Sequence, residues 1–292
     1  MPTSFDYPST DGTSIRGWRG DGQGLPVIIS NGLGTIPQAW PGLIGANSGY
    51  DVRTWYYRGT FGSDRPRDPG RIRVEDHVED MVALMDHEGI ERALVAGWSI
   101  GVNIAFEFAQ RHPDRVAGLM AVAGVPGGTF GTMGAPWRIP RRLRQPIATR
   151  AAKALRVAGP VLTPIAHRIP VNDRVAWLIS HTGVMRPAAK AKVLTPMLEE
   201  FLKQDWTWYM GLAVAAAEHS PMDVSFLQCP TTLVAGKHDV LTSMHDILDA
   251  ASRIPHAQIT VLPGSHFLPM EYPKLVATAL DELARRSDLL VA

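Results

Sequence analysis

Short apolar runs alternate with amphipathic segments along most of this chain of 292 residues, and this alternation constrains the fold more than any other feature. Runs of roughly four to eight residues rich in Val, Ile and Leu predict buried strands. Segments in which apolar residues recur every three or four positions predict helices that pack on a sheet. Strand, helix and strand in succession are typical of a parallel sheet covered by helices. The sequence therefore predicts an α/β fold.

The predicted elements can be assigned in chain order. They begin with a hairpin whose turn is Asp11-Gly12, because Asp-Gly favours the tight turn that joins two antiparallel strands. The later strands are expected at 26–30, 52–57, 92–96, 116–123, 231–235 and 258–262, and the helices at 74–88, 100–112, 244–253 and 272–286.

Residues 126–220 interrupt the alternation, since they contain helix-like segments and no convincing strand. Proline lacks the N–H that a helix interior needs. We therefore expect short helices broken at Pro136, Pro140, Pro146, Pro160, Pro164, Pro170, Pro187 and Pro196. The predicted organisation is a core domain of residues 1–125 and 221–292, with a helical insertion at 126–220.

A G-x-S-x-G motif lies where the strand ending at Ala96 meets the following helix. It reads Gly97-Trp98-Ser99-Ile100-Gly101, and the small residues at both ends allow the chain to turn sharply. Such a turn exposes the hydroxyl of its central serine at the amino end of a helix. Ser99 is therefore the candidate nucleophile.

A serine hydroxyl needs a base to remove its proton, and the base needs a carboxylate to orient it. Asp239 follows the strand that ends at Ala235, and His266 follows the strand that ends at Leu262. The carboxyl ends of parallel strands share one edge of a sheet, so both side chains are expected on the same edge as Ser99. The sequence predicts a Ser99–His266–Asp239 triad. Other acidic residues are expected to be solvated or capping residues rather than alternative catalytic acids, namely Asp223, Glu271 and Asp86.

With these motifs in the order Ser, Asp, His, the chain resembles the α/β-hydrolase superfamily over essentially its whole length. The resemblance implies that residues 126–220 form the helical cap that this family places over its active site. Segment 57–64 resembles the arginine-glycine loop of the family, with Phe61 where a glycine is usual. Epoxide hydrolases and haloalkane dehalogenases carry an aspartate at the turn, so Ser99 disfavours their chemistry.

The same resemblance implies an oxyanion hole built from two backbone N–H groups, those of Leu33 and Ile100. Asn31-Gly32 stands where the family commonly has His-Gly, and its asparagine is expected to brace the loop through hydrogen bonds. The loop is similar to that of the enol-lactone hydrolases. Trp98 is expected to pack beside the turn.

Several other chemistries are not favoured. The single cysteine, Cys229, rules out an intramolecular disulfide, and we expect it to be buried and inert. The histidine spacing predicts no metal site, and no glycine pattern for a nucleotide or dinucleotide is complete, so no cofactor is expected. A net charge of +1 argues against a dedicated nucleic-acid binder. The amino terminus predicts no secretory signal and no run predicts a membrane span, so a cytoplasmic location is expected.

The net charge hides an uneven distribution. Residues 126–220 contain thirteen Lys and Arg against five Asp and Glu, a formal charge of +8, which leaves −7 on the remainder. A solvated surface or a face between copies of the chain is the first interpretation. A basic insertion can also attract an anionic substrate such as an acyl-carrier thioester, or dock on an anionic membrane.

The predicted function is hydrolysis of a carboxylic ester, lactone or thioester through an acyl-enzyme. The same triad serves C–C bond hydrolysis, acyl transfer or cofactor-free perhydrolysis. A ligand receptor with little turnover is an alternative of another class. The sequence leaves these open, because pocket shape and water access decide among them.

Overall fold

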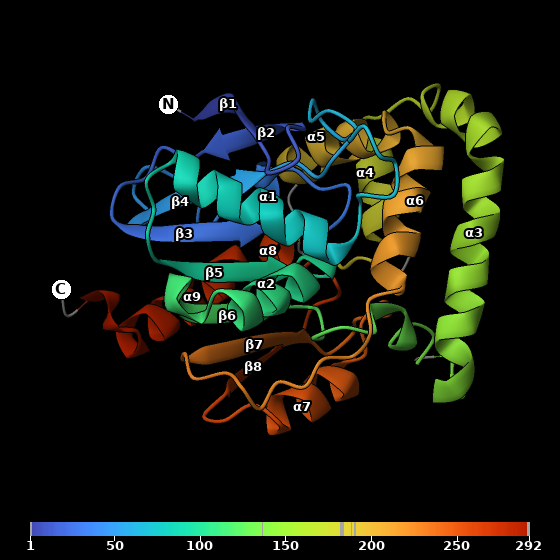
Figure 1. Cartoon of the computed structure of the whole chain (residues 1–292). Coiled ribbons are helices and arrows are strands. Elements are labelled where there is room, and N and C mark those ends of the chain that lie inside the picture. Colours follow the sequence, from blue (N-terminus) through green and yellow to red (C-terminus); the bar gives the residue numbers. More distant parts are fainter. Residues whose placement is uncertain (1, 136, 182–183, 188, 190, 291–292) are drawn as a thin grey trace.

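The computed structural model describes residues 2–135, 137–181, 184–187, 189 and 191–290. Its centre is an eight-stranded sheet with the order β1-β2-β4-β3-β5-β6-β7-β8 (Figure 1). The strands are β1 (Thr3–Pro8), β2 (Ser14–Arg19), β3 (Leu25–Ser30), β4 (Tyr50–Trp55), β5 (Ala93–Trp98), β6 (Val116–Val122), β7 (Thr231–Gly236) and β8 (Gln258–Leu262). Each predicted strand is confirmed to within a few residues.

The sheet is mostly parallel. Only β1 with β2 and β2 with β4 pair antiparallel among the described strands, and from β4 to β8 every pair is parallel. The middle strand β5 is buried along its whole length, as expected of a strand covered on both faces. Val95 packs into one core and its neighbours Leu94 and Ala96 pack into the other.

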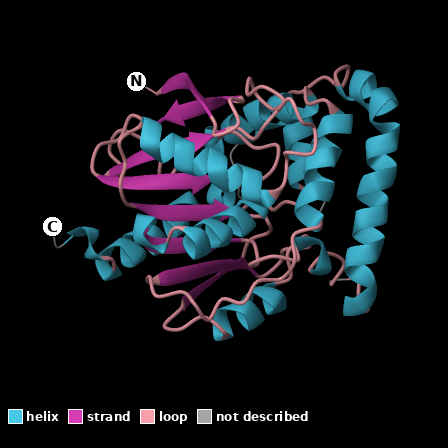
Figure 2. Ribbon diagram, viewed as in Figure 1, coloured by secondary structure: helices cyan, strands magenta, loops and turns pink. Residues whose placement is uncertain are grey.

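Helices cover both faces of the sheet (Figure 2). On one face lie α1 (Val74–His87), α2 (Ile100–Arg111) and α7 (Met244–Ser252), whose apolar residues join the core that contains Val95. On the other face lie α8 (Leu268–Glu271) and α9 (Pro273–Arg286). The predicted α/β fold is confirmed, and the loops that leave the carboxyl ends of the parallel strands lie along one edge.

Four further helices lie beyond that edge (Figure 1). They are α3 (Arg141–Ala166), α4 (Asp173–Ser180), α5 (Ala191–Leu202) and α6 (Trp206–Ala217). The described part of 126–220 contains no strand. None of the described helices is long and apolar enough to cross a bilayer.

One expectation for this segment is wrong, because several prolines do not break helices. Pro146, Pro160 and Pro164 lie inside α3, and Pro196 lies inside α5; Pro136 is outside the described residues. Helix α3 packs along α6, and tertiary packing of this kind overrides local propensity. Thr163 adds two contacts, since its hydroxyl donates to the carbonyl of Gly159 at 2.8 Å and accepts the N–H of Trp206 at 3.1 Å.

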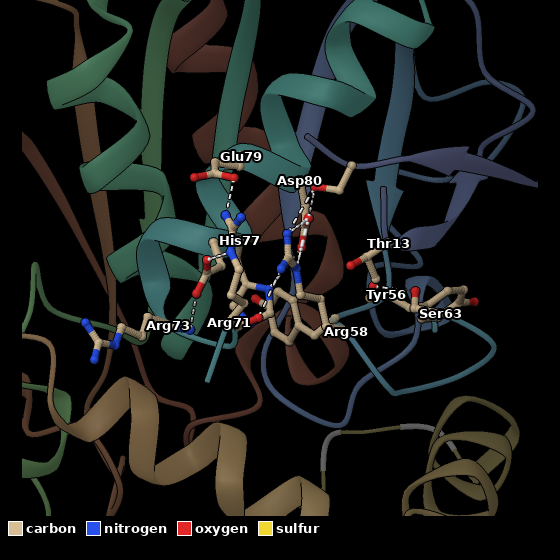
Figure 3. A network of polar contacts seen from close by, with 12 residues as sticks. Thr13, Tyr56, Arg58, Ser63, Arg71, Arg73, His77, Glu79 and Asp80 are labelled. Carbon is tan, nitrogen blue, oxygen red and sulfur yellow. Dashed lines mark hydrogen bonds and ion pairs between the residues drawn. The ribbon is translucent and has the colours of Figure 1, made fainter. Parts of the chain in front are cut away.

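The loop after β4 is held by a buried polar network (Figure 3). The Arg58 guanidinium and the Asp80 carboxylate are both fully buried and form an ion pair at 2.8 Å. Arg58 also donates to Asp11 at 2.7 Å, and its carbonyl accepts from Trp208 Nε1 of α6 at 2.7 Å. Burial alone would raise the pKa of Asp80, but hydrogen bonds from His77 and Arg58 outweigh it and hold that pKa below its usual value. The network therefore ties this loop to α1 and α6.

Phe61 lies in the same loop, at the position where the resemblance expects a glycine. It adopts a positive φ of 49°, a conformation that glycine reaches at no steric cost. Its ring lies 5.2 Å from that of Tyr56, and this contact helps to hold the conformation.

Candidate active site

The G-x-S-x-G motif forms the sharp turn that the sequence predicts. Ser99 has a φ of +57° and immediately precedes α2, and the cavity that it lines also contains His266. A Cβ on Gly97 would lie 2.6 Å from the carbonyl oxygen of Gly101, and one on Gly101 would lie 2.1 Å from that of Ser30. Both positions therefore require glycine, because a larger residue would push the turn open.

The structure brings together the three side chains proposed for the triad. Nε2 of His266 lies 2.8 Å from Oγ of Ser99, and Nδ1 of His266 lies 2.9 Å from Oδ2 of Asp239. The carboxylate of Asp239 is fully buried, and its other oxygen accepts the N–H groups of Leu241 and Thr242, both at 2.8 Å. This arrangement fixes the carboxylate and presents one oxygen to the imidazole.

Two neighbours hold the His266 loop in place. Trp98 lies beside the turn, as predicted, and its Nε1 donates to the carbonyl of His266 at 2.9 Å. The side chain of Glu271 accepts from the backbone N–H of Ser265 at 2.7 Å and from its hydroxyl at 2.6 Å. Glu271 also accepts the N–H of Arg186, which belongs to segment 126–220, at 2.7 Å.

The role of Glu271 corrects a sequence expectation. The sequence interpretation treated Glu271 as a solvated or capping residue, but the structure buries it with 5% of its surface exposed. Its partners lie both six residues and 85 residues away in the chain. Contacts with residues this far away in the chain leave no pattern in the local sequence.

The loop after β3 lies against the nucleophile turn. The side chain of Asn31 donates to Thr54 Oγ1 and accepts from Trp40 Nε1, both at 2.8 Å, so it does brace the loop. Gly32 packs against the ring of Trp98. Leu33 and Ile100 line the same cavity as Ser99 and His266.

That cavity has a volume of about 590 Å³ and is mainly apolar. One wall comes from the sheet edge, and the other comes from α3, α5 and α6 through Ala148, Leu155, Met197, Leu198, Phe201 and Tyr209. Burial raises the pKa of Tyr209, so its hydroxyl stays protonated and donates to the carbonyl of Leu33 at 3.4 Å. The cavity can hold an apolar group next to the hydroxyl of Ser99.

Outside the cavity, Cys229 is half-buried, and burial raises the pKa of its thiol.

Glu75, Glu107 and His219 offer three possible metal-ligand atoms within 4.8 Å of one another. Glu107 is already paired with Arg111 at 2.6 Å and with His219 at 3.2 Å. The lining of the cavity that contains Ser99 includes none of these three residues.

Comparison with known families agrees with the fold. The family model described as the alpha/beta hydrolase fold matches residues 26–151, which include the nucleophile turn. A putative carbamate hydrolase, RutD, from Caulobacter segnis is 36% identical over 111 residues, which is 38% of this chain and 41% of that protein. Epoxide hydrolase B from Mycobacterium tuberculosis is 34% identical over 127 residues, 38% of this chain and 34% of that protein. The chain thus matches less than half the length of these relatives.

Longer matches are more distant. A 2-hydroxymuconate semialdehyde hydrolase from Pseudomonas putida is 26% identical over 92% of this chain and 90% of its own length. The crystal structure of the enol-lactonase from Burkholderia xenovorans superimposes with a TM-score of 0.69 at 19% identity, covering 96% of this chain and 99% of that one. Similarity at this level establishes the shared fold and leaves the substrate open.

Proposed function

We propose that this chain, which has the alpha/beta hydrolase fold, is a serine hydrolase of carboxylic esters, lactones or thioesters. The observation that carries the proposal is the continuous hydrogen-bonded series from Ser99 Oγ through His266 to Asp239, at 2.8 and 2.9 Å. A serine in such a series is an activated nucleophile.

In the proposed mechanism, Oγ of Ser99 attacks the substrate carbonyl while Nε2 of His266 takes its proton. Asp239 holds the imidazole with its proton on Nδ1 and stabilises the imidazolium that forms. His266 then gives the proton to the leaving group, and the C–O or C–S bond breaks. A water molecule, deprotonated by the same nitrogen, attacks the acyl-enzyme and releases the acid and Ser99.

The negative oxygen of each tetrahedral intermediate would be bound by the N–H groups of Leu33 and Ile100. The proposal is supported by their position on the wall that also contains Ser99. Removing one donor from such a site typically lowers kcat by about 100-fold to 1,000-fold. Asn31 supports this loop from behind, through its contacts with Thr54 and Trp40.

We assign segment 126–220 as a cap over the core formed by 1–125 and 221–292. The supporting observation is that α3, α5 and α6 supply one wall of the cavity. Because that wall is apolar, the acyl or alkyl portion of the substrate is expected to be apolar as well.

The names of the relatives point to more than one bond type. One is a putative carbamate hydrolase, and another hydrolyses a semialdehyde by its name. Both carbamate cleavage and C–C bond hydrolysis are therefore second candidates for the same triad. Epoxide chemistry is less favoured, because Ser99 occupies the turn where epoxide hydrolases carry an aspartate.

The test is labelling with a fluorophosphonate, followed by hydrolysis of a panel of short and long acyl esters, lactones, thioesters and carbamates. Wild type should be labelled and Ser99→Ala should not, whereas Ser252→Ala, which alters an exposed serine, serves as the matched control. If Ser99→Ala keeps its activity, the assignment of the nucleophile is wrong. Labelling without turnover on any member of the panel would indicate a receptor.

A further inference from the structure

Helix α3 carries an apolar stripe on its exposed side. Five large apolar residues of this helix are between 44% and 83% exposed, namely Leu143, Ile147, Val157, Val161 and Ile165. Soluble proteins scatter such residues singly and seldom place them in a row. We call these five residues the α3 stripe.

The stripe faces away from the rest of the molecule. Successive residues of an α-helix are rotated by about 100°, so Val161 lies on the opposite side from Ala152, nine residues earlier. Ala152, Gly159 and Ala166 are the buried positions of α3. Figure 1 shows α3 as the outermost helix on this side of the molecule, so among the described residues no element covers the stripe.

Cationic side chains lie beside the stripe, and Arg150 lies within it, three residues after Ile147. Five of them surround a hollow of about 640 Å³ between the start of α3 and α7, namely Arg141, Arg142, Arg150, Lys153 and Arg253. One carboxylate, Asp246, shares this hollow, and it is engaged by Arg141 and Arg144. In sequence, no acidic residue occurs between Asp114 and Asp173.

The active-site cavity borders the stripe on its other flank. Ala151 and Leu155 lie on α3 and also line that cavity. Leu155 is 41% exposed and Val184, another lining residue, is 42% exposed, so the cavity also has exposed apolar residues on its wall. An exposed apolar face with cations beside it is the composition of helices that lie in the surface of a membrane.

We propose that α3 docks on an anionic lipid surface, with its stripe in contact with the acyl chains and its arginines and lysines in contact with the headgroups. Docking would bring the cavity that contains Ser99 next to the bilayer. A second copy of the chain is the competing occupant, and its charge argues against it. In a symmetric dimer the same basic surfaces would face one another, and the formal charge of 126–220 is +8.

The first experiment measures co-sedimentation of the full chain with vesicles. Phosphatidylcholine vesicles are compared with vesicles that contain about a quarter phosphatidylglycerol, at about 0.1 M and about 1 M salt. We expect at least tenfold tighter binding to the anionic vesicles at the lower salt concentration and loss of most of that difference at the higher one. Equal binding to both kinds of vesicle, or no binding, would overturn the proposal.

Variants then test the surface itself. A triple variant of the stripe should bind anionic vesicles at least tenfold more weakly than wild type; its substitutions are Val157→Ser, Val161→Ser and Ile165→Ser. A double variant that removes two cations, Arg142→Gln/Arg150→Gln, should also bind these vesicles at least tenfold more weakly. The matched control is Ile259→Ser/Val261→Ser/Leu275→Ser, which removes apolar residues with 44–46% exposure from other elements. A stripe variant that binds like wild type, or a control that loses binding equally, refutes the assignment of α3.

Two further measurements separate the possible explanations. Every surface variant should hydrolyse a short soluble ester like wild type, which shows that it is folded. Ser99→Ala should lose this hydrolysis and still bind vesicles like wild type. Light scattering gives the oligomeric state without lipid. If wild type is a dimer that Val161→Glu converts to monomer, the stripe is an interface between copies and the lipid proposal fails.

Discussion

Replacement of Asp239 by asparagine tests the proposed mechanism most directly, because the structure fixes how the new amide must lie. One carboxylate oxygen accepts the N–H groups of Leu241 and Thr242 at 2.8 Å, and the other faces Nδ1 of His266 at 2.9 Å. In Asp239→Asn the amide oxygen has to remain on the two backbone donors. Its NH₂ group then points at His266, so Nδ1 becomes an acceptor and the ring proton moves to Nε2, where it blocks the transfer from Ser99.

The expected loss can be worked out from these contacts. For catalysis the amide oxygen would have to face Nδ1 of His266, which turns the NH₂ group toward the two backbone donors. This orientation gives up two hydrogen bonds worth about 1 kcal/mol each, so at most about 3% of molecules adopt it. This alone costs about 30-fold in kcat/KM. Loss of the negative charge beside the imidazolium adds about 1.5–3 kcal/mol, or roughly another 10-fold to 100-fold. The two factors together give a loss of about 300-fold to 3,000-fold, somewhat less than the factor of about 10⁴ known for a triad held in the wrong tautomer.

The assay is kcat/KM on a short acyl ester together with the rate of fluorophosphonate labelling, and both should fall together. Asp223→Asn is the matched control, since Asp223 is exposed and accepts the N–H of Ser225 at 3.0 Å in a similar turn. The melting temperature of Asp239→Asn should stay close to that of wild type, because the substitution keeps shape and backbone contacts. A loss smaller than tenfold would refute the tautomer argument.

Two other predictions concern stability and positioning. Asp80→Asn should lower the free energy of unfolding at pH 7 by about 3 kcal/mol, because it leaves the buried Arg58 without its main partner. The folded-state pKa of Asp80 is depressed, so its contribution is complete above the unfolded-state pKa of about 4 and is lost as the pH falls from there through the lower folded-state pKa. Between pH 7 and pH 3, urea unfolding should therefore show the variant losing less stability than wild type. Glu271→Gln should lower kcat about tenfold by loosening the loop that carries His266, while the melting temperature changes little. Steady-state kinetics measure this loss, and an unchanged kcat would show that Glu271 does not position His266.

The positions of the main elements and of the candidate triad followed from local sequence. Buried parallel strands need continuous apolar runs, so 92–96 and 231–235 were recognisable from composition alone. The nucleophile turn was equally visible, because the close approach of Gly97 and Gly101 to backbone oxygens excludes any larger residue. Strand order then determined that Asp239 and His266 follow strands ending at one edge.

Only the tertiary structure decided what depends on partners far away in the chain. Pro146 and Pro160 looked like helix breaks, but the packing of α3 against α6 offsets the hydrogen bonds that they remove. Glu271 looked solvated, yet donors from Ser265 and from the distant Arg186 compensate the cost of burying its charge. The basic character of 126–220 was apparent from the sequence. The exposure of the α3 stripe was not, because whether an apolar residue of a helix is buried depends on which other elements pack against that side of the helix.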